Sequence, residues 1–346
     1  MTTSLDPDAM PSWLARLGDR TRTRNVIAGI NDDDCAVFRW SNKLLVVTTD
    51  HLNARPIALE LGLGSYRTLG RLLVGANMSD LCGSGAKPEA MLVGITMPRD
   101  ASREDFQVLM LGVRQECSAF KVPLIGGDTK LGKSMSLLGV AIGSAASRRN
   151  LFLKNGARAG DIIWVSGPVG SCSAAIVGIK EDFGNKAWKK WAKNAITAPS
   201  VPLLASRQLS RARVANGGID ISDGLGNDLS RLCEASNVGV IIDSARIPIA
   251  PEVAYLASAK QLPGWAFSFA SGGDFQFLAT TNISARTSMQ RMGFSEIGRT
   301  APNRELRVRT PLGKTVALPV GGHRDRGFKS FYHEVKSLVR GTKYAW

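Results

Sequence analysis

The feature that most constrains this chain is a recurring placement of acidic residues beside glycine, serine or threonine at the ends of expected strands. Carboxylates in such turns offer the oxygen ligands that hard cations bind, and Mg²⁺ is usually held by one or two carboxylates, with phosphate oxygens and water completing its shell. Several of them together suit a nucleoside triphosphate whose charge is neutralised by more than one Mg²⁺. The six clusters lie at residues 32–34, 49–50, 77–80, 126–129, 220–224 and 272–274.

Each cluster alone also has a purely structural explanation, because Asp beside Gly is common in turns. An EF-hand is excluded at 32–34, since Cys35 and Ala36 follow and the required alternation and glycine are missing. Residues 127–134 fit the phosphate-loop pattern G-x-x-x-x-G-K-[ST], which must be followed by a helix. Residues 135–143 contain two glycines and β-branched residues and predict a strand, so we interpret this match as accidental.

The 346 residues suggest about two domains. A composition break at 144–150, where small residues and two arginines follow an apolar run, predicts a first domain at 1–150 and a second at 151–346. Both halves mix strands with helices, which indicates α+β domains with mixed sheets. Helices are expected from Leu69, from Ser102 with a capping box to Asp105, from Ser171 and from Leu225. Strands are expected at 44–47, 122–125, 135–143, 162–165, 219–221 and 238–243.

The net charge of +15 is uneven: residues 1–150 contribute +3 (18 basic, 15 acidic) and residues 151–346 contribute +12 (26 basic, 14 acidic). Such asymmetry fits a nucleic-acid-binding half or a surface that attracts phosphorylated small molecules. The stretch 186–193 interleaves lysines with Trp188 and Trp191, which could stack on bases. We favour a surface helix with packed tryptophans and solvated lysines, so a nucleic-acid partner is not expected.

Five scattered cysteines, never spaced as C-x-x-C, and three histidines form no zinc pattern. Reduced, buried thiols are the expected state and indicate a cytoplasmic protein. The polar N-terminal stretch lacks the apolar core of a signal peptide. No apolar run approaches the ~20 residues that span a bilayer, so no membrane partner is expected.

Seven ordered motifs run along the chain. They are DDCAV at 33–37, VTTD at 47–50, NMSDL at 77–81 with GAKP at 85–88, IGGDT at 125–129, NGARAGD at 155–161, IDISDGL at 219–225 and SGGDF at 271–275. Together and in this order they resemble the thiamine-monophosphate kinase family. That family belongs to the superfamily that includes aminoimidazole-ribonucleotide synthetase, selenophosphate synthetase and a hydrogenase maturation protein.

The resemblance implies a two-domain fold of the aminoimidazole-ribonucleotide synthetase type. Its first domains would pair into a homodimer and bind ATP through several Mg²⁺ ions. The terminal phosphoryl group would pass directly to an acceptor phosphate, a reaction that needs positioning and charge neutralisation more than a nucleophile. The implied metal ligands are Asp33, Thr49, Asp50, Asp80, Asp128, Asp220 and Asp223. The implied nucleotide contacts are Gly126, Gly127, Asp128, Thr129, Arg148 and Ser222. Asp34, Asp274 and Phe275 would contact the substrate, and Asp128 and Asp223 would be catalytic.

Three departures from the family pattern fall at or near the acceptor side. The kinases usually continue Thr-Thr-Asp with Leu-Val-Glu-Gly-Val-His-Phe, whereas this chain reads Leu-Asn-Ala-Arg-Pro-Ile at 52–57. The usual helix lysine is Leu72, and the late Asp-Tyr-Glu is Asp274-Phe275-Gln276. ATP and Mg²⁺ are therefore firmer expectations than the acceptor. Thiamine monophosphate is the first choice of acceptor; the alternatives are an amide or other oxygen of a specialised metabolite, or a lost activity.

Overall fold

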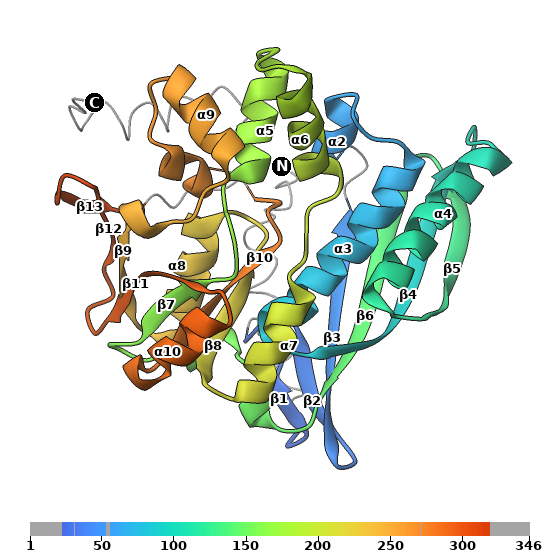
Figure 1. Ribbon diagram of the computed structural model, residues 1–346. Helices are drawn as coiled ribbons and strands as arrows, with labels where there is room; N and C mark the ends of the chain where they lie inside the picture. Colours follow the sequence, from blue (N-terminus) through green and yellow to red (C-terminus); the bar gives the residue numbers. More distant parts are fainter. Residues whose placement is uncertain (1–22, 31, 53–55, 271, 319–346) are drawn as a thin grey trace, which may run out of the picture.

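The computed structural model describes residues 23–30, 32–52, 56–270 and 272–318, which form two sheets with helices packed against them (Figure 1). The first sheet has the strand order β1-β2-β3-β6-β4-β5. Its neighbouring strands are antiparallel, except that β4 and β5 run parallel and are joined by helix α4 (Arg103–Phe120). The strands are β1 (Val26–Ala28), β2 (Ala36–Trp40), β3 (Lys43–Leu52), β4 (Lys87–Pro98), β5 (Leu124–Gly132) and β6 (Ser136–Ala145).

Helices α3 (Tyr66–Ser84) and α4 cover one face of the first sheet and form an apolar core with it. The capping box expected at the start of α4 is confirmed: the Ser102 hydroxyl accepts from the N–H of Asp105, whose carboxylate accepts from the N–H of Ser102. On the other face, the side chains of β3 and β6 that alternate with the buried ones are half-buried or exposed. One face of the sheet is therefore much less covered than the other.

The second sheet has the order β13-β12-β9-β11-β7-β10-β8 and is antiparallel except for the pair β12 and β9. Helices lie on both faces: Ile163 and Val165 pack with α5, α6, α8 and α9, whereas Ile162 and Trp164 pack with α7 and α10. The strands are β7 (Ile162–Val165), β8 (Ala215–Ile221), β9 (Gly239–Asp243), β10 (Gln276–Thr281), β11 (Ser295–Ala301), β12 (Leu306–Arg309) and β13 (Thr315–Ala317).

The other helices are α2 (Ile57–Glu60), which precedes α3, and those of the second half. The latter are α5 (Ser171–Lys180), α6 (Lys186–Thr197), α7 (Leu203–Ala212), α8 (Leu225–Ser236), α9 (Pro251–Ala259) and α10 (Arg286–Arg291). Short 3₁₀ turns lie at Arg148–Asn150, Lys154–Gly156, Ser244–Arg246, Gly264–Phe269 and Ile283–Ala285.

Helix α3 lies between the two sheets and packs on both, against β3 and β6 of the first and β8 and β10 of the second (Figure 1). Gly83 permits this approach, because a Cβ there would stand only 2.4 Å from the backbone nitrogen of Asp220 in β8. Ser79 and Asp80 lie about one turn earlier on the same helix. The close approach therefore brings acidic residues of the two halves together.

The expected α+β architecture with mixed sheets is confirmed, and β7 and the starts of α5 and α8 lie where the sequence predicts them. The strand expected at 122–125 is wrong at both ends, because β5 begins at Leu124 and continues to Gly132. Gly126 and Gly127 do not end it, since their backbone pairs with Leu92 and Val93 of β4. The division of the chain near residue 150 stays a proposal.

Two alternative interpretations of the sequence are decided by local structure. The segment after Ser134 is the predicted strand, β6, so residues 127–134 lack the helix that a phosphate loop requires. In α6, Trp188 is only 4% exposed and donates from Nε1 to the carbonyl oxygen of Glu252. Trp191 packs beside it, with ring centroids 5.5 Å apart. The packed surface helix is confirmed, and the buried Trp188 ring is not accessible to a nucleic-acid base.

The prediction of reduced, buried thiols is also confirmed: Cys35, Cys82, Cys117, Cys172 and Cys233 are all buried and unpaired. Such thiols pack as small apolar side chains. Across the described ranges, the structure has no helix with both the length and the apolar character needed to cross a membrane.

Candidate active site

Four aspartates from distant parts of the sequence approach one another where α3 meets both sheets. We call Asp34, Asp50, Asp80 and Asp220 the acidic cluster. Alternation along β3 places Thr48 and Asp50 on the face toward α3, where the Thr48 hydroxyl donates to Asp80 at 2.5 Å and the Asp50 N–H donates to the Asn77 side chain at 3.3 Å. From the other half, Asp220 of β8 accepts from the Ser79 hydroxyl at 2.7 Å.

Burial and mutual repulsion dominate the electrostatics of the acidic cluster. Burial raises the pKa of Asp80 well above its usual range, and the charges of Asp220, Asp50 and Asp34 raise it further. The pKa of Asp220 is raised in the same way, by burial first and then by Asp34. Buried carboxylates in this state are stabilised by a cation. In the described part of the chain, however, no three His, Cys, Asp or Glu side chains stand close enough together to enclose a metal ion.

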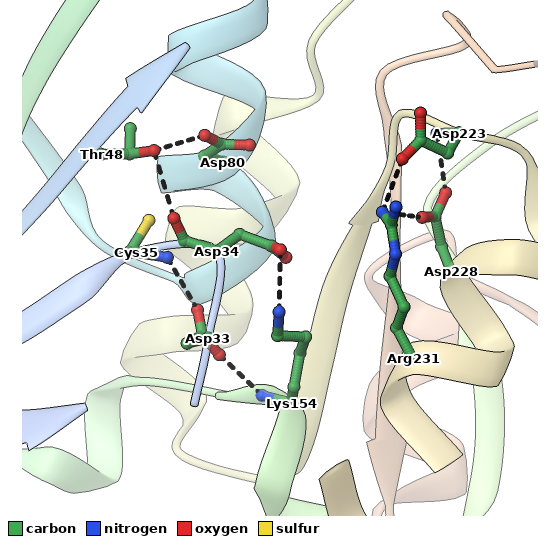
Figure 2. Close-up of polar contacts among 9 residues, drawn as sticks. All are labelled: Asp33, Asp34, Cys35, Thr48, Asp80, Lys154, Asp223, Asp228 and Arg231. Atoms are coloured by element: carbon green, nitrogen blue, oxygen red, sulfur yellow. Dashed lines mark hydrogen bonds and ion pairs between the residues drawn. The ribbon is translucent and has the colours of Figure 1, made fainter. Parts of the chain in front are cut away.

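The adjacent Asp33 and Asp34 have different surroundings (Figure 2). Asp33 accepts from the backbone N–H of Lys154 at 2.7 Å and from that of Cys35 at 3.2 Å. Burial, followed by the charge of Asp34, raises the pKa of Asp33 to about 7. Asp34 instead forms an ion pair with the Lys154 ammonium at 2.9 Å and acts electrostatically on Asp80 and Asp220. Asp34 thus acts on the acidic cluster and Asp33 is held by backbone, whereas the sequence predicted Asp33 as a metal ligand and Asp34 as a substrate contact.

A second acidic group lies where β8 leads into α8. Asp223 follows β8, and Arg231 of α8 reaches both Asp223 and Asp228, as Figure 2 shows. Asp228 is fully buried, and its carboxylate also accepts from the N–H of Asp223 at 3.0 Å. Burial, then the charge of Asp223, raises the pKa of Asp228 to about 8. Asp223 is therefore placed by two residues outside the predicted set.

Two other predicted metal ligands are not brought to the acidic cluster. Thr49 is exposed, because it alternates with Thr48 and Asp50 along β3 and points to the less covered face. Asp128 is exposed on the edge strand β5 and pairs with Lys130 at 3.0 Å. Strands β6 and β4 lie between β3 and β5, so Asp128 is about 14 Å across the sheet from β3, the strand that carries Asp50. Within one chain, the predicted metal set is divided between two faces.

The predicted substrate contact Asp274 lies against the N-terminus of α5. Its carboxylate is buried and accepts from the N–H groups of Gly170 at 2.5 Å and Cys172 at 2.9 Å, at the N-terminus of α5. Burial raises its pKa to about 6, although these N–H groups oppose the rise. Because backbone N–H groups engage both oxygens, Asp274 stabilises the N-terminus of α5, and its contact with a substrate stays a prediction. Phe275 is half-buried in a left-handed conformation (φ 51°), with its ring facing Gly75 of α3.

The predicted nucleotide contacts lie in three places. Gly126, Gly127 and Thr129 are within β5 beside Asp128. Arg148 is half-buried and donates to the carbonyl of Leu151 at 3.1 Å; burial lowers its pKa and nearby Asp33 opposes this. Ser222 precedes Asp223, and its carbonyl accepts from the N–H of Gly273 at 2.9 Å.

Four residues of this region were not predicted from the sequence: Thr48, Lys154, Asp228 and Arg231. Thr48 has a signal in the sequence, because residues two apart on a strand share a face and Asp50 is a predicted ligand. Asp228 and Arg231 lie three apart on a helix, a spacing typical of an ion pair. Lys154 carries no such signal, since its partner Asp34 is 120 residues away in the sequence.

Two family models match most of the chain. The model described as AIR synthase related protein, N-terminal domain, matches residues 32–145, and AIR synthase related protein, C-terminal domain, matches residues 158–308. The chain belongs to the AIR synthase related protein family. Asp34, Asp50 and Asp80 fall in the region matched by the first model and Asp220 in that matched by the second, so the acidic cluster lies where the two AIR synthase related domains meet.

Curated relatives and solved structures agree with this membership. The thiamine-monophosphate kinase of Corynebacterium glutamicum is 28% identical over 306 residues, covering 87% of this chain and 90% of that protein. That of Pyrococcus abyssi is 28% identical over 252 residues, covering 72% and 76%. The structure of AaThiL complexed with AMPPCP and TMP matches with a TM-score of 0.78 at 21% identity, over 93% of this chain and 100% of that chain. This likeness supports the AIR synthase related fold of both halves.

Proposed function

We propose that this chain is an ATP- and Mg²⁺-dependent phosphotransferase that converts thiamine monophosphate to thiamine diphosphate by direct transfer. The observation that carries the proposal is the half-buried acidic cluster at the junction of two AIR synthase related domains. Curated relatives that cover most of the chain are named thiamine-monophosphate kinases. A related structure holds TMP with AMPPCP, an ATP analogue.

The donor set suits Mg²⁺, because it consists of carboxylate oxygens with hydroxyls nearby. Asp34, Asp50, Asp80, Asp220 and Asp223 would be shared among several Mg²⁺ ions, because one or two carboxylates per ion suffice when phosphate oxygens and water complete the shell. When bound, Mg²⁺ neutralises phosphate charge and aligns the reacting groups. The chain itself orients the ligands: Thr48 holds Asp80 and Ser79 holds Asp220. Cys35 lies against this group, but burial raises the pKa of its thiol well above the usual range, which supports transfer without a cysteine nucleophile.

A homodimer formed through the first domain is part of the proposal. Eight of the nine residues of the edge strand β5 are exposed, including Ile125 and Leu131 at 58% and 61%. An edge strand of this kind is a template for pairing with another chain. Thr49 and Asp128 lie on the less covered face of the same sheet, so a second copy that also packs on this face would enclose the predicted ligands that one chain leaves exposed.

Light scattering during size-exclusion chromatography tests the dimer. We expect a mass of twice the 37.0 kDa of the chain. Ile125→Lys places a charge on the exposed edge and should yield the monomer. A wild-type chain that elutes as a monomer at micromolar concentration contradicts this part of the proposal.

Two observations favour a second candidate for the acceptor of the phosphoryl group. The sequence departures lie on the acceptor side, and Asp274 is engaged by the N-terminus of α5. These observations favour, as a second candidate, the same phosphoryl transfer to another small molecule. The altered residues 53–55 lie outside the described residues. The cytoplasm stays the expected compartment, on the ground of five unpaired cysteines.

An assay of both products tests the proposal. With ATP, Mg²⁺ and thiamine monophosphate, we expect ADP and thiamine diphosphate in equal amounts, and neither product when unphosphorylated thiamine replaces the acceptor. Tight binding of AMPPCP without formation of thiamine diphosphate would move the conclusion to the second candidate. Absence of Mg²⁺-dependent nucleotide binding would contradict both the proposed function and the second candidate.

A further inference from the structure

Arg231 of α8 holds two carboxylates through a single nitrogen. Its Nη1 lies 2.6 Å from Asp223 Oδ2 and 3.2 Å from Asp228 Oδ1 (Figure 2). Nε and Nη2 donate no hydrogen bond to any residue that the structure describes. The guanidinium is therefore anchored at one corner and retains its other donors.

The surroundings of Arg231 leave those donors accessible. Its side chain is 41% exposed, whereas the side chains of Asp228 and Asp223 are 1% and 22% exposed. Burial lowers the pKa of Arg231, but Asp223 and Asp228 raise it by more, and Asp34 of the acidic cluster contributes in the same direction. Arg231 thus stands at the border between the acidic cluster and solvent.

Lys154 provides a contrast within the same site. Its side chain is only 10% exposed, and its ammonium pairs with Asp34. Lys154 therefore acts as an internal counter-ion. Of these two cations, only Arg231 combines a fixed position with donors that remain available.

We infer that Arg231 binds the oxygens of a terminal phosphoryl group in the assembled site. The inference rests on the proposed function. A guanidinium presents paired N–H donors that match phosphate oxygens, which an ammonium cannot do. If a cation takes the Asp223 oxygen, the buried Asp228 still holds Nη1, and Nε and Nη2 face the incoming phosphate. Arg231 is then a substrate-binding residue outside the acidic motifs.

The phosphoryl group has two possible sources, the nucleotide and the acceptor, and binding measurements separate them. Calorimetry in Mg²⁺ compares the affinity for AMPPCP with that for ADP, which lacks the terminal phosphoryl group. It likewise compares thiamine monophosphate with thiamine, which lacks the phosphoryl group of the acceptor. In Arg231→Gln, we expect the affinity for AMPPCP or thiamine monophosphate to fall about 10- to 100-fold, with ADP and thiamine unchanged. Arg231→Lys should lower the same affinity several-fold, because lysine keeps the positive charge but lacks the paired N–H donors of a guanidinium.

Arg246→Gln is a matched control, because Arg246 also pairs with an aspartate three residues earlier, Asp243, and with Glu296. It should leave all four affinities unchanged. If Arg231→Gln does not fold, as judged by thermal melting without ligand, Arg231→Lys decides the test. Wild-type affinities in a folded Arg231 variant overturn the inference and leave the proposed function standing. A wild-type chain that binds neither AMPPCP nor thiamine monophosphate removes the proposed function and the inference with it.

Discussion

We expect Asp80→Asn to reduce kcat by about 10²- to 10³-fold or more, because it removes the central charge of the acidic cluster. Asp80 is half-buried among Asp34, Asp50 and Asp220, and the asparagine oxygen can still accept from Thr48. The fold should therefore persist. Removing a carboxylate that repels its neighbours should also raise the unfolding temperature in the absence of Mg²⁺. Steady-state kinetics and thermal melting in a chelator measure the two effects.

Asp161→Asn is the control for a buried aspartate outside the site. Asp161 is 3% exposed and accepts from the N–H of Arg158 and the side chain of Asn216. Its replacement weakens those bonds, so it should lower the unfolding temperature and leave kcat unchanged. The two variants are thus expected to change activity and stability in opposite ways. A kcat of Asp80→Asn within tenfold of the wild-type value would contradict the role of the acidic cluster.

We expect the metal-free protein to lose stability as the pH rises from about 5 to 8. The pKa values of Asp33 and Asp228 are raised to about 7 and about 8, and those of Asp80 and Asp220 are also raised, all mainly by burial. Over this range the folded chain binds protons that the unfolded chain, with carboxyl pKa values near 4, has released. The unfolding free energy then falls by at most about 1.4 kcal/mol per pH unit for each such group.

Urea unfolding at several pH values, in a chelator and in Mg²⁺, measures this dependence. Mg²⁺ should reduce the slope, because it stabilises the ionised cluster, and Asp228→Asn should reduce it in the chelator. Asp128 and Asp182 do not affect the pH dependence of stability between pH 5 and 8. Their Lys130 and Lys189 partners lower their pKa values, so the stability that they contribute is lost only at more acidic pH. Stability that is flat or rises between pH 5 and 8 in the chelator would contradict the electrostatic account.

Much of the fold could be predicted because its signals are local. The capping box of Ser102 and Asp105, the apolar run of β7 and the helical spacing that begins at Leu225 each depend on neighbours in the sequence. The edges of β5 could not be predicted, because Gly126 and Gly127 are typical of a turn and are held in a strand only by pairing with β4. Pairing with a distant strand overrides the local preference there.

The amino-acid sequence alone identifies the residue types and motifs of the candidate site. The family resemblance of the motifs implies Asp50, Asp80 and Asp220 as metal ligands, and these residues make up three of the four aspartates of the acidic cluster. Which side of each motif faces the site depends on the tertiary structure. Asp34 rather than Asp33 acts on Asp80 and Asp220, Thr48 rather than Thr49 shares a face with Asp50, and Asp274 caps a helix.

The physical reason is that adjacent residues on an extended chain point in opposite directions, and the direction that is buried depends on distant packing. Ser79 and Asp220 are 141 residues apart and meet because α3 packs against β8 at Gly83. The motifs in the sequence specify which chemical groups are available. Where that chemistry is placed follows from the contact of the two sheets with one helix.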